Sequence, residues 1–216
     1  MAPVTPDKLL DVAIAIFGLH GPEGASTRQI AKAADTAMSA ITYHYGGKEG
    51  LYLAAADHIA NKLTQSMALH FDEAAAISQD DAAGARRTIR ALLASLTERV
   101  SQGEQADHAR FILREQAHPT AAFDHIYDGF LARLYAAVAR LIVIATGVDS
   151  RTAIITASGL FGLSLSPRSS KSALLRQLGR DHYDPDTRAD VQACLDAAVI
   201  SILDGLAARA NGKDLP

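Results

Sequence analysis

Helical periodicity recurs along almost the whole 216-residue chain, and this feature most restricts the fold that it can adopt. Apolar residues return at spacings of three and four, which places them on one face of an α-helix. Runs in which apolar and polar residues alternate, as in a half-buried strand, are nearly absent. Because 49% of the residues are hydrophobic, such helices can bury a substantial core. We therefore predict an all-α fold.

Gly, Pro and hydroxyl residues indicate where the first helices begin and end. We expect helices over residues 7–20, 27–34 and 38–45, followed by a long helix that begins at Lys48. Ser26 or Thr27 would cap the second helix, and Gly46-Gly47 would end the third. The fourth helix joins the two parts of the molecule without a flexible linker, and its apolar face consists of Leu51, Ala55, Ile59, Leu63 and Met67.

The remainder of the chain is predicted to be helical as well, with short loops at 167–170 and 180–186. The expected helices span residues 81–102, 104–117, 120–146, 150–165, 171–178 and 185–210. The helix at 120–146 has the clearest apolar stripe: Phe123, Tyr127, Phe130, Leu134, Val138 and Leu141.

Two short helices joined by a tight turn, at 27–34 and 38–45, are typical of a helix-turn-helix unit. Ala31 is small enough for the two helices to cross closely. Four residues later the turn requires a positive φ, and Asp35 tolerates this conformation better than most residues other than Gly. Ile41 would then be the core-facing side chain of the second helix. The sequence thus predicts an N-terminal three-helix domain over 1–50 and a helical domain over 51–216.

Residues 10–55 resemble the DNA-binding domain of the TetR/AcrR family of regulators. The most specific segments are Thr27-Arg28-Gln29-Ile30-Ala31 and Tyr43-His44-Tyr45-Gly46-Gly47-Lys48-Glu49-Gly50-Leu51. Where the family prefers Gly-Val-Ser in the turn, this chain has Asp35-Thr36-Ala37, so it lacks the usual serine contact at the start of the recognition helix.

The C-terminal part is similar to the CecR-like branch of that family at 111–116 and 118–124. The resemblance implies a transcription regulator, commonly a repressor released by a small-molecule effector. It also implies a homodimer joined by the last two long helices, here 150–165 and 185–210, that binds an inverted repeat in duplex DNA. Ala157, Gly159 and Gly162 would permit close approach, and Val191, Leu195, Val199, Ile202 and Leu206 form an apolar edge. Alternatively, these stripes pack within one subunit.

The predicted DNA-binding domain carries no net positive charge, although it contains Lys8, Arg28, Lys32 and Lys48. Since phosphate contacts by cations supply most non-specific affinity, such a domain depends on dimerisation and on helix N-termini to hold DNA. We expect Thr27, Arg28, Tyr43, His44 and Lys48 to contact the DNA backbone. The base edges would face Ala37, Met38, Ser39 and Thr42, whereas Tyr45 is expected to point inward.

Polar and aromatic residues gather in the segment from 111 to 128, a combination that suits a small-molecule site. The candidate effector-binding residues are Phe111, Arg114, Glu115, His118, Phe123 and Tyr127. In the alternative interpretation, Arg114 and Glu115 form an ordinary ion pair and the histidines face solvent.

Other classes of protein remain as alternatives. Glu115 and His118 have the three-residue spacing of di-iron helices, but this pair occurs once and the site needs it twice, so we predict no metal and no cofactor. The chain has no sequence typical of a nucleophile elbow and is not expected to be an enzyme. A helical protein-interaction module without DNA binding stays open because the N-terminal domain is not basic.

Several features favour a cytoplasmic protein. The first residues show no secretory signal, and the longest charge-free apolar stretch, 152–167, is shorter than the roughly 20 residues of a membrane span. The single cysteine, Cys194, has no intramolecular partner for a disulfide. We therefore expect no membrane interaction.

Overall fold

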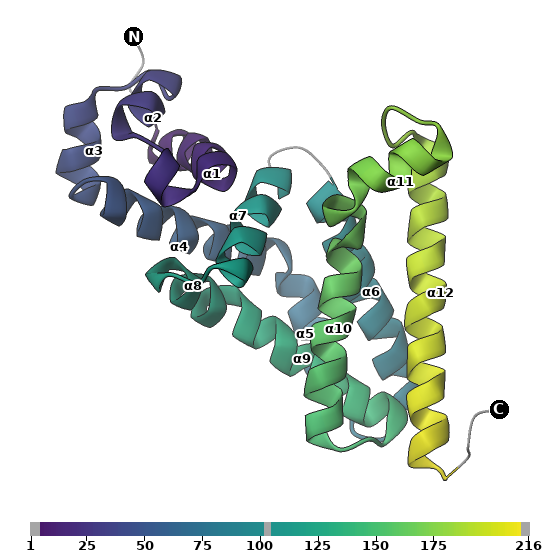
Figure 1. Cartoon of the computed structure of the whole chain (residues 1–216). Coiled ribbons are helices and arrows are strands. Elements are labelled where there is room, and N and C mark those ends of the chain that lie inside the picture. Colours follow the sequence, from purple (N-terminus) through teal and green to yellow (C-terminus); the bar gives the residue numbers. More distant parts are fainter. Residues whose placement is uncertain (1–4, 102–104, 213–216) are drawn as a thin grey trace. The chain divides into compact units, whose positions relative to one another are not determined.

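The computed structural model describes residues 5–101 and 105–212, and every regular element in these ranges is a helix (Figure 1). The predicted all-α fold is confirmed. The helices form two compact units, one from residues 5–66 with 105–132 and the other from 67–101 with 133–212.

In the first unit, the N-terminal helices are α1 (Pro6–Gly24), α2 (Thr27–Ala33), α3 (Met38–Tyr45) and α4 (Lys48–Ser66). Ser26 caps α2, because its hydroxyl accepts a hydrogen bond of 3.1 Å from the Gln29 amide. Gly21 has φ +71° and interrupts α1 at the predicted end, after which one more turn follows.

Three further elements complete the first unit: α7 (Gln105–Ala117), α8 (Ala121–Ile126) and the π-helical segment η1 (Tyr127–Leu131). Helix α1 packs on α4 and α7, while α4 also contacts α8 and η1. Three aromatic rings connect α1, α4 and α7, since the Tyr52 ring lies 4.8 Å from Phe17 and 4.7 Å from Phe111 between centroids. Helix α4 is therefore the central element of this unit.

The helix expected at 120–146 is not a uniform α-helix. Over Tyr127–Leu131 it widens into a π-turn, in which the Ala132 amide donates to the Tyr127 carbonyl. Thr64 supplies a partner for this irregular backbone, because its hydroxyl donates to the Gly129 carbonyl at 2.8 Å. The extra residue moves the buried face, so Tyr127 is 42% exposed and Ile126 and Leu131 are buried instead. The prediction that Tyr127 belongs to the apolar stripe is wrong.

The second unit contains α5 (Ala68–Ala76), α6 (Ala82–Ser101), α9 (Ala132–Thr146), α10 (Ser150–Ser169), α11 (Lys171–Leu178) and α12 (Pro185–Ala210). The sequence patterns did not predict α5. Helix α10 continues through Pro167, where we expected a loop, and its last turns are supported by Ser166 and Ser170 hydroxyls that donate to carbonyls of the same helix. Helix α6 is the main partner of α10.

Helix α12 buries few of its side chains within the chain. Its buried residues are Thr187, Val199 and Leu203, and two ion pairs connect it to α6. Arg90 binds both carboxylate oxygens of Asp196 at 2.6 Å, and Arg86 lies 2.5 Å from Asp204. By length and composition alone, α12 and residues 121–146 are apolar enough to span a membrane; half of the 121–146 window is buried, but only 11% of the α12 window.

Candidate DNA-binding site

The turn between α2 and α3 has the expected geometry. Asp35 adopts φ +56° and is the only non-glycine residue with positive φ in the described part of the chain. The Thr36 amide donates to the Ala31 carbonyl at 2.9 Å and closes the turn. Ala31 and Ile41 are both buried, as predicted from their spacing. These three positions fix the direction in which α3 leaves α2.

The far end of α3 is fixed by two glycines. Gly46 adopts the left-handed conformation and its amide donates to the Thr42 carbonyl at 3.0 Å. Gly50, in the first turn of α4, lies so close to α3 that a Cβ atom added there would be 1.8 Å from the Tyr45 carbonyl oxygen. The sequence pattern marked this glycine without a reason, and the structure gives one: α4 begins directly against the last turn of α3.

One face of α3 is open to solvent. Tyr43 is 84% exposed and Met38 is 50% exposed. The other residues expected on this face, namely Ala37, Ser39, Thr42 and His44, are exposed as well. The Tyr43 and His44 rings meet edge to face at 5.0 Å. The open face thus combines aromatic, hydroxyl and apolar groups.

The remaining predicted DNA contacts lie at the starts of α2 and α4. Arg28 is exposed, whereas Thr27 and Lys48 are half-buried. Tyr45 is also half-buried, and burial, together with the charge of Asp7, raises the pKa of its phenol. This environment agrees with the inward position that we expected for Tyr45.

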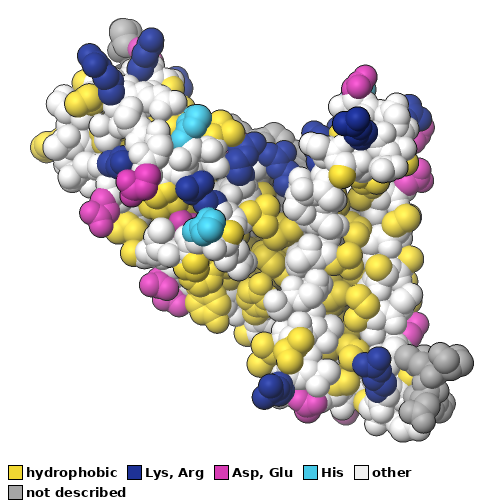
Figure 2. Space-filling model, viewed as in Figure 1, with side chains coloured by type: hydrophobic (Ala, Val, Ile, Leu, Met, Phe, Trp, Pro, Cys, Tyr) yellow, Lys and Arg dark blue, Asp and Glu magenta, His cyan; other side chains and the backbone are white. Residues whose placement is uncertain are grey.

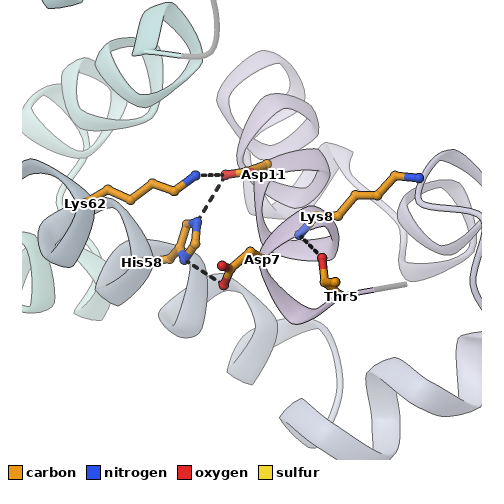
Figure 3. Close-up of polar contacts among 6 residues, drawn as sticks. All are labelled: Thr5, Asp7, Lys8, Asp11, His58 and Lys62. Atoms are coloured by element: carbon orange, nitrogen blue, oxygen red, sulfur yellow. Dashed lines mark hydrogen bonds and ion pairs between the residues drawn. The ribbon is translucent and has the colours of Figure 1, made fainter. Parts of the chain in front are cut away.

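A charged contact between α1 and α4 escaped the sequence analysis (Figure 3). Asp11 accepts hydrogen bonds from Lys62 at 2.8 Å and from His58 at 3.1 Å, and Asp7 lies 3.9 Å from His58. Burial acts to raise the pKa of Asp11, but the hydrogen bonds from Lys62 and His58 outweigh it and lower the pKa. Asp7 and Asp11 are four residues apart on α1, and His58 and Lys62 are four residues apart on α4. Each pair therefore lies on one helix face, and this spacing was the available sequence signal.

Three candidate effector residues lie against helices α1 and α4. Phe111 is fully buried in the aromatic cluster. The Glu115 side chain is buried too, accepting from the Tyr52 hydroxyl at 2.6 Å and from the Thr120 amide and hydroxyl at 3.0 and 2.9 Å. The Arg114 guanidinium covers Gly21, where an added Cβ would lie 2.0 Å from Arg114 Nη2. Arg114 and Glu115 do not form the alternative ion pair with each other.

The other three candidates lie in α8, in η1 and in the segment just before α8. His118 is exposed, and the half-buried Phe123 ring stacks on Tyr127 with 5.9 Å between centroids. Of the six predicted residues, two are buried, two are half-buried and two are exposed: Phe111 and Glu115, Arg114 and Phe123, and His118 and Tyr127, respectively. Within the described ranges, no group of three or more His, Cys, Asp or Glu side chains is placed to hold a metal ion.

Two family models match the chain. Residues 9–55 match the model described as "Bacterial regulatory proteins, tetR family". Residues 85–206 match the C-terminal domain of the HTH-type transcriptional dual regulator CecR. Together these models cover α2, α3 and most of α1 in the N-terminal part, and most of the chain after residue 84.

A curated relative and two solved structures agree with these matches. The HTH-type transcriptional dual regulator CecR of Shigella flexneri is 31% identical over 207 residues, which cover 94% of this chain and 92% of that protein. Mycobacterium smegmatis AmtR has a TM-score of 0.62 at 18% identity, over 100% of this chain and 99% of its own. The fatty acid degradation regulator FadR from Bacillus halodurans has a TM-score of 0.62 at 16% identity, over 94% and 95%.

Proposed function

Since the chain belongs to the TetR family of DNA-binding transcription regulators, in the branch of CecR, we propose that it acts in the cytoplasm as a homodimeric repressor that a small-molecule effector releases from an inverted-repeat operator. Residues 1–50 are assigned to DNA binding and residues 51–216 to dimerisation and effector binding.

The exposed face of α3 is the observation that carries this proposal. Ala31, Asp35 and Ile41 hold α3 at its start, Gly46 and Gly50 hold it at its end, and its open face is free to enter a groove. A helix fixed at both ends can deliver its side chains to base edges with little loss of conformational entropy on binding.

The residues assigned to DNA contacts divide into two groups by the part of the DNA that each is expected to touch. Thr27, Arg28, Tyr43, His44 and Lys48 are assigned to the phosphate backbone. The base edges are assigned to Ala37, Met38, Ser39 and Thr42, with Met38 and Ala37 suited to thymine methyl groups. Because few of these residues are cationic, both recognition helices of a dimer are needed for strong binding.

The second copy is proposed to pack on α10 and α12. On α10, Gly159 and Gly162 face open space, with nothing within 4 Å of an added Cβ, next to the exposed Ile155. Ile200 and Ile202 are exposed on α12. A protein partner suits α12 better than lipid, because Asp196 lies near its middle and Asp204 in its C-terminal half, and charged groups inside a bilayer are costly. Of the edge that we predicted, Val199 is already buried within the chain.

The effector is proposed to act through the contacts that join α7 to α1 and α4. Phe111, Arg114 and Glu115 already contact residues of those helices, while the exposed His118 and Tyr127 and the half-buried Phe123 lie nearby on the same segment of chain. A ligand that favours a different position of α7 would shift the population of α1 and α4 positions in the same sense.

Selection of bound fragments from genomic DNA by the full-length protein tests the function. We expect a palindromic sequence, because two copies of α3 read two half-sites. Tyr43→Ala and Lys48→Ala should weaken binding to all sequences alike, whereas Thr42→Ala should change the preferred sequence. His44→Ala should also weaken binding, and His20→Ala, an exposed histidine on α1, serves as its matched control. Failure to enrich any sequence would contradict the proposal.

A further inference from the structure

Helices α1, α2, α3 and α4 form a closed ring, because each contacts the next and α4 returns to α1. The α1–α4 contact is apolar at one end, where the Phe17 ring meets Tyr52. At the other end it is charged, and His58 and Lys62 of α4 meet two carboxylates of α1 (Figure 3). The recognition helix α3 is thus carried by two helices whose mutual position depends in part on charge.

His58 has an acid at each of its ring nitrogens. Its Nε2 lies 3.1 Å from Asp11 Oδ1, its Nδ1 lies 3.9 Å from Asp7 Oδ1, and its side chain is only 11% exposed. A neutral imidazole donates from one nitrogen and turns a lone pair toward the other acid, whereas an imidazolium donates from both. The arrangement therefore suits the charged form of His58.

The other charged and titratable groups near the His58 ring come from α4 and α7. Lys62, one turn along α4, donates to the same carboxylate oxygen as His58, at 2.8 Å. On α7, burial, and then the charge of Lys62, lower the pKa of His108 to about 4, so this buried imidazole is neutral between pH 6 and 8. Asp107, also on α7, is paired with Arg110. The two carboxylates of α1 are thus balanced by two cations only when His58 is protonated.

Asp7 connects this contact to the end of α3. Burial, and then the charge of Asp7, raise the pKa of Tyr45, which is the last residue of α3. Asp7 therefore lies near both His58 and the point where the recognition helix ends. Acidic, basic and histidine side chains are all visible on the face of this unit in Figure 2, so no single sign of charge dominates that face. A change of one charge at the α1–α4 contact is consequently not masked by a strong surrounding field.

We propose that His58 is a positioning residue for DNA binding: as an imidazolium it holds α1 on α4 through Asp7 and Asp11, and DNA affinity falls when it loses its proton. Histidine is the side chain whose charge ordinarily changes between pH 5 and 8. DNA selects the position of α1 that this contact holds, so the affinity falls with the fraction of protein in that position. The inference rests on the DNA binding proposed above, but on neither the effector nor the dimer.

The test measures the affinity of the full-length protein for the fragment that it selects from genomic DNA, at pH 6 and pH 8 and constant ionic strength. The wild-type affinity should fall with pH about threefold more than that of His58→Gln, the effect of one partly exposed ion pair. His44, assigned to the phosphate backbone, is present in both proteins and cancels in this comparison. His58→Lys keeps a positive charge at both pH values and should show the smaller pH dependence of His58→Gln while binding more tightly.

His125→Gln is the matched control. His125 Nδ1 lies 2.7 Å from Asp57 in the same unit, but this pair joins α8 to α4 rather than to α1. The variant removes a histidine–aspartate contact of similar kind and should retain the wild-type pH dependence.

Every other result counts against the proposal. Equal pH dependence in wild type and His58→Gln would overturn it, and so would a smaller pH dependence in His125→Gln. If urea denaturation shows that His58→Gln does not fold, His58→Lys decides the question, because a wild-type pH dependence there would exclude His58 as its source. Selection of no sequence by the wild type would overturn the proposed function together with this inference, whereas a selected sequence bound with unchanged pH dependence would overturn the inference alone.

Discussion

Tyr52 and Glu115 illustrate how single residues join helix α4 to α7 and to the start of α8 in the first unit. Their hydrogen bond is buried and 2.6 Å long, and the other oxygen of Glu115 holds the start of α8 through Thr120. Removing the phenol hydroxyl leaves part of a buried carboxylate without its donor. We expect Tyr52→Phe to lower the free energy of unfolding by about 1–3 kcal/mol, measured by urea denaturation. Tyr43→Phe, at an exposed ring, should change stability little.

The same pair predicts an effect of alkaline pH. Burial, and then the hydrogen bond to Glu115, raise the pKa of Tyr52 above its ordinary value of 10.0. Because the unfolded phenol ionises first, this contribution is complete below about pH 10 and is lost as the pH rises above it. Between pH 9 and 11, wild type should therefore lose stability more steeply than Tyr52→Phe. If the free energy of unfolding fell equally with pH in both proteins, Tyr52 would not be the source of this loss.

His108 predicts an effect at acidic pH. Burial, and then the charge of Lys62, lower the pKa of His108 to about 4, so the imidazole is neutral in the folded protein. The unfolded chain takes up this proton near pH 6.5. The contribution of the neutral His108 to the free energy of unfolding is therefore complete above pH 6.5, and about 3 kcal/mol of it is lost as the pH decreases toward 4. His108→Gln should lack this loss in pH-dependent urea denaturation; an unchanged slope would exclude His108 as its source.

At this scale, the residues predicted well are those whose role depends on neighbours close in sequence. The positive φ of Asp35 and the burial of Ala31 and Ile41 follow from spacing within the helix-turn-helix. Glu115 was placed in an effector set because it lies among polar residues in sequence. Its burial against Tyr52, 63 residues away, depends on packing that the local pattern does not contain.

Among the helices, most boundaries follow from caps and breakers, and the exceptions depend on tertiary contacts. Helices α3, α11 and α12 span the predicted residues. Helix α5 was missed because the preceding apolar pattern continues through Met67, where the chain turns. The π-turn was missed because its support comes from another helix, through Thr64 and Ala60 of α4.

The fit of η1 against α4 can be tested by a double-mutant cycle. A Cβ added at Gly129 would lie 2.8 Å from the Ala60 Cβ, so Gly129→Ala should lower the free energy of unfolding by about 1–3 kcal/mol. Ala60→Gly alone should cost about 1 kcal/mol as a helix-interior glycine. The double variant should be more stable than the sum of the two losses predicts, as measured by denaturation. Additive losses would show that the two residues do not share this space.

For the whole molecule, helix α12 has far more apolar surface than the chain covers. A sequence pattern could mark this helix as apolar, but only the structure separates the residues buried inside, such as Val199 and Leu203, from those left exposed, such as Ile200 and Ile202. The pattern likewise grouped Ala157 with Gly159 and Gly162, although Ala157 is buried and the two glycines face open space.

The proposed dimer predicts that a large side chain at Gly159 prevents association without unfolding the chain. We expect Gly159→Leu to convert dimer to monomer in sedimentation at micromolar concentration, while the helical circular dichroism signal is retained. Ala75→Leu places the same side chain on an exposed position of α5 and should remain dimeric. If the Gly159→Leu variant remained dimeric, α10 would not form part of the dimer interface.

The sharing of Asp11 between Lys62 and His58 has a consequence for the dependence of DNA binding on salt concentration in the cell. Lys62 on α4 is already paired, and residues 1–50 contain four Lys and Arg side chains, so each copy in the proposed dimer would displace few potassium ions on binding DNA. Its operator occupancy should then change little when osmotic stress raises the cytoplasmic potassium concentration, so the genes it controls would respond to their signal rather than to the ionic state of the cell.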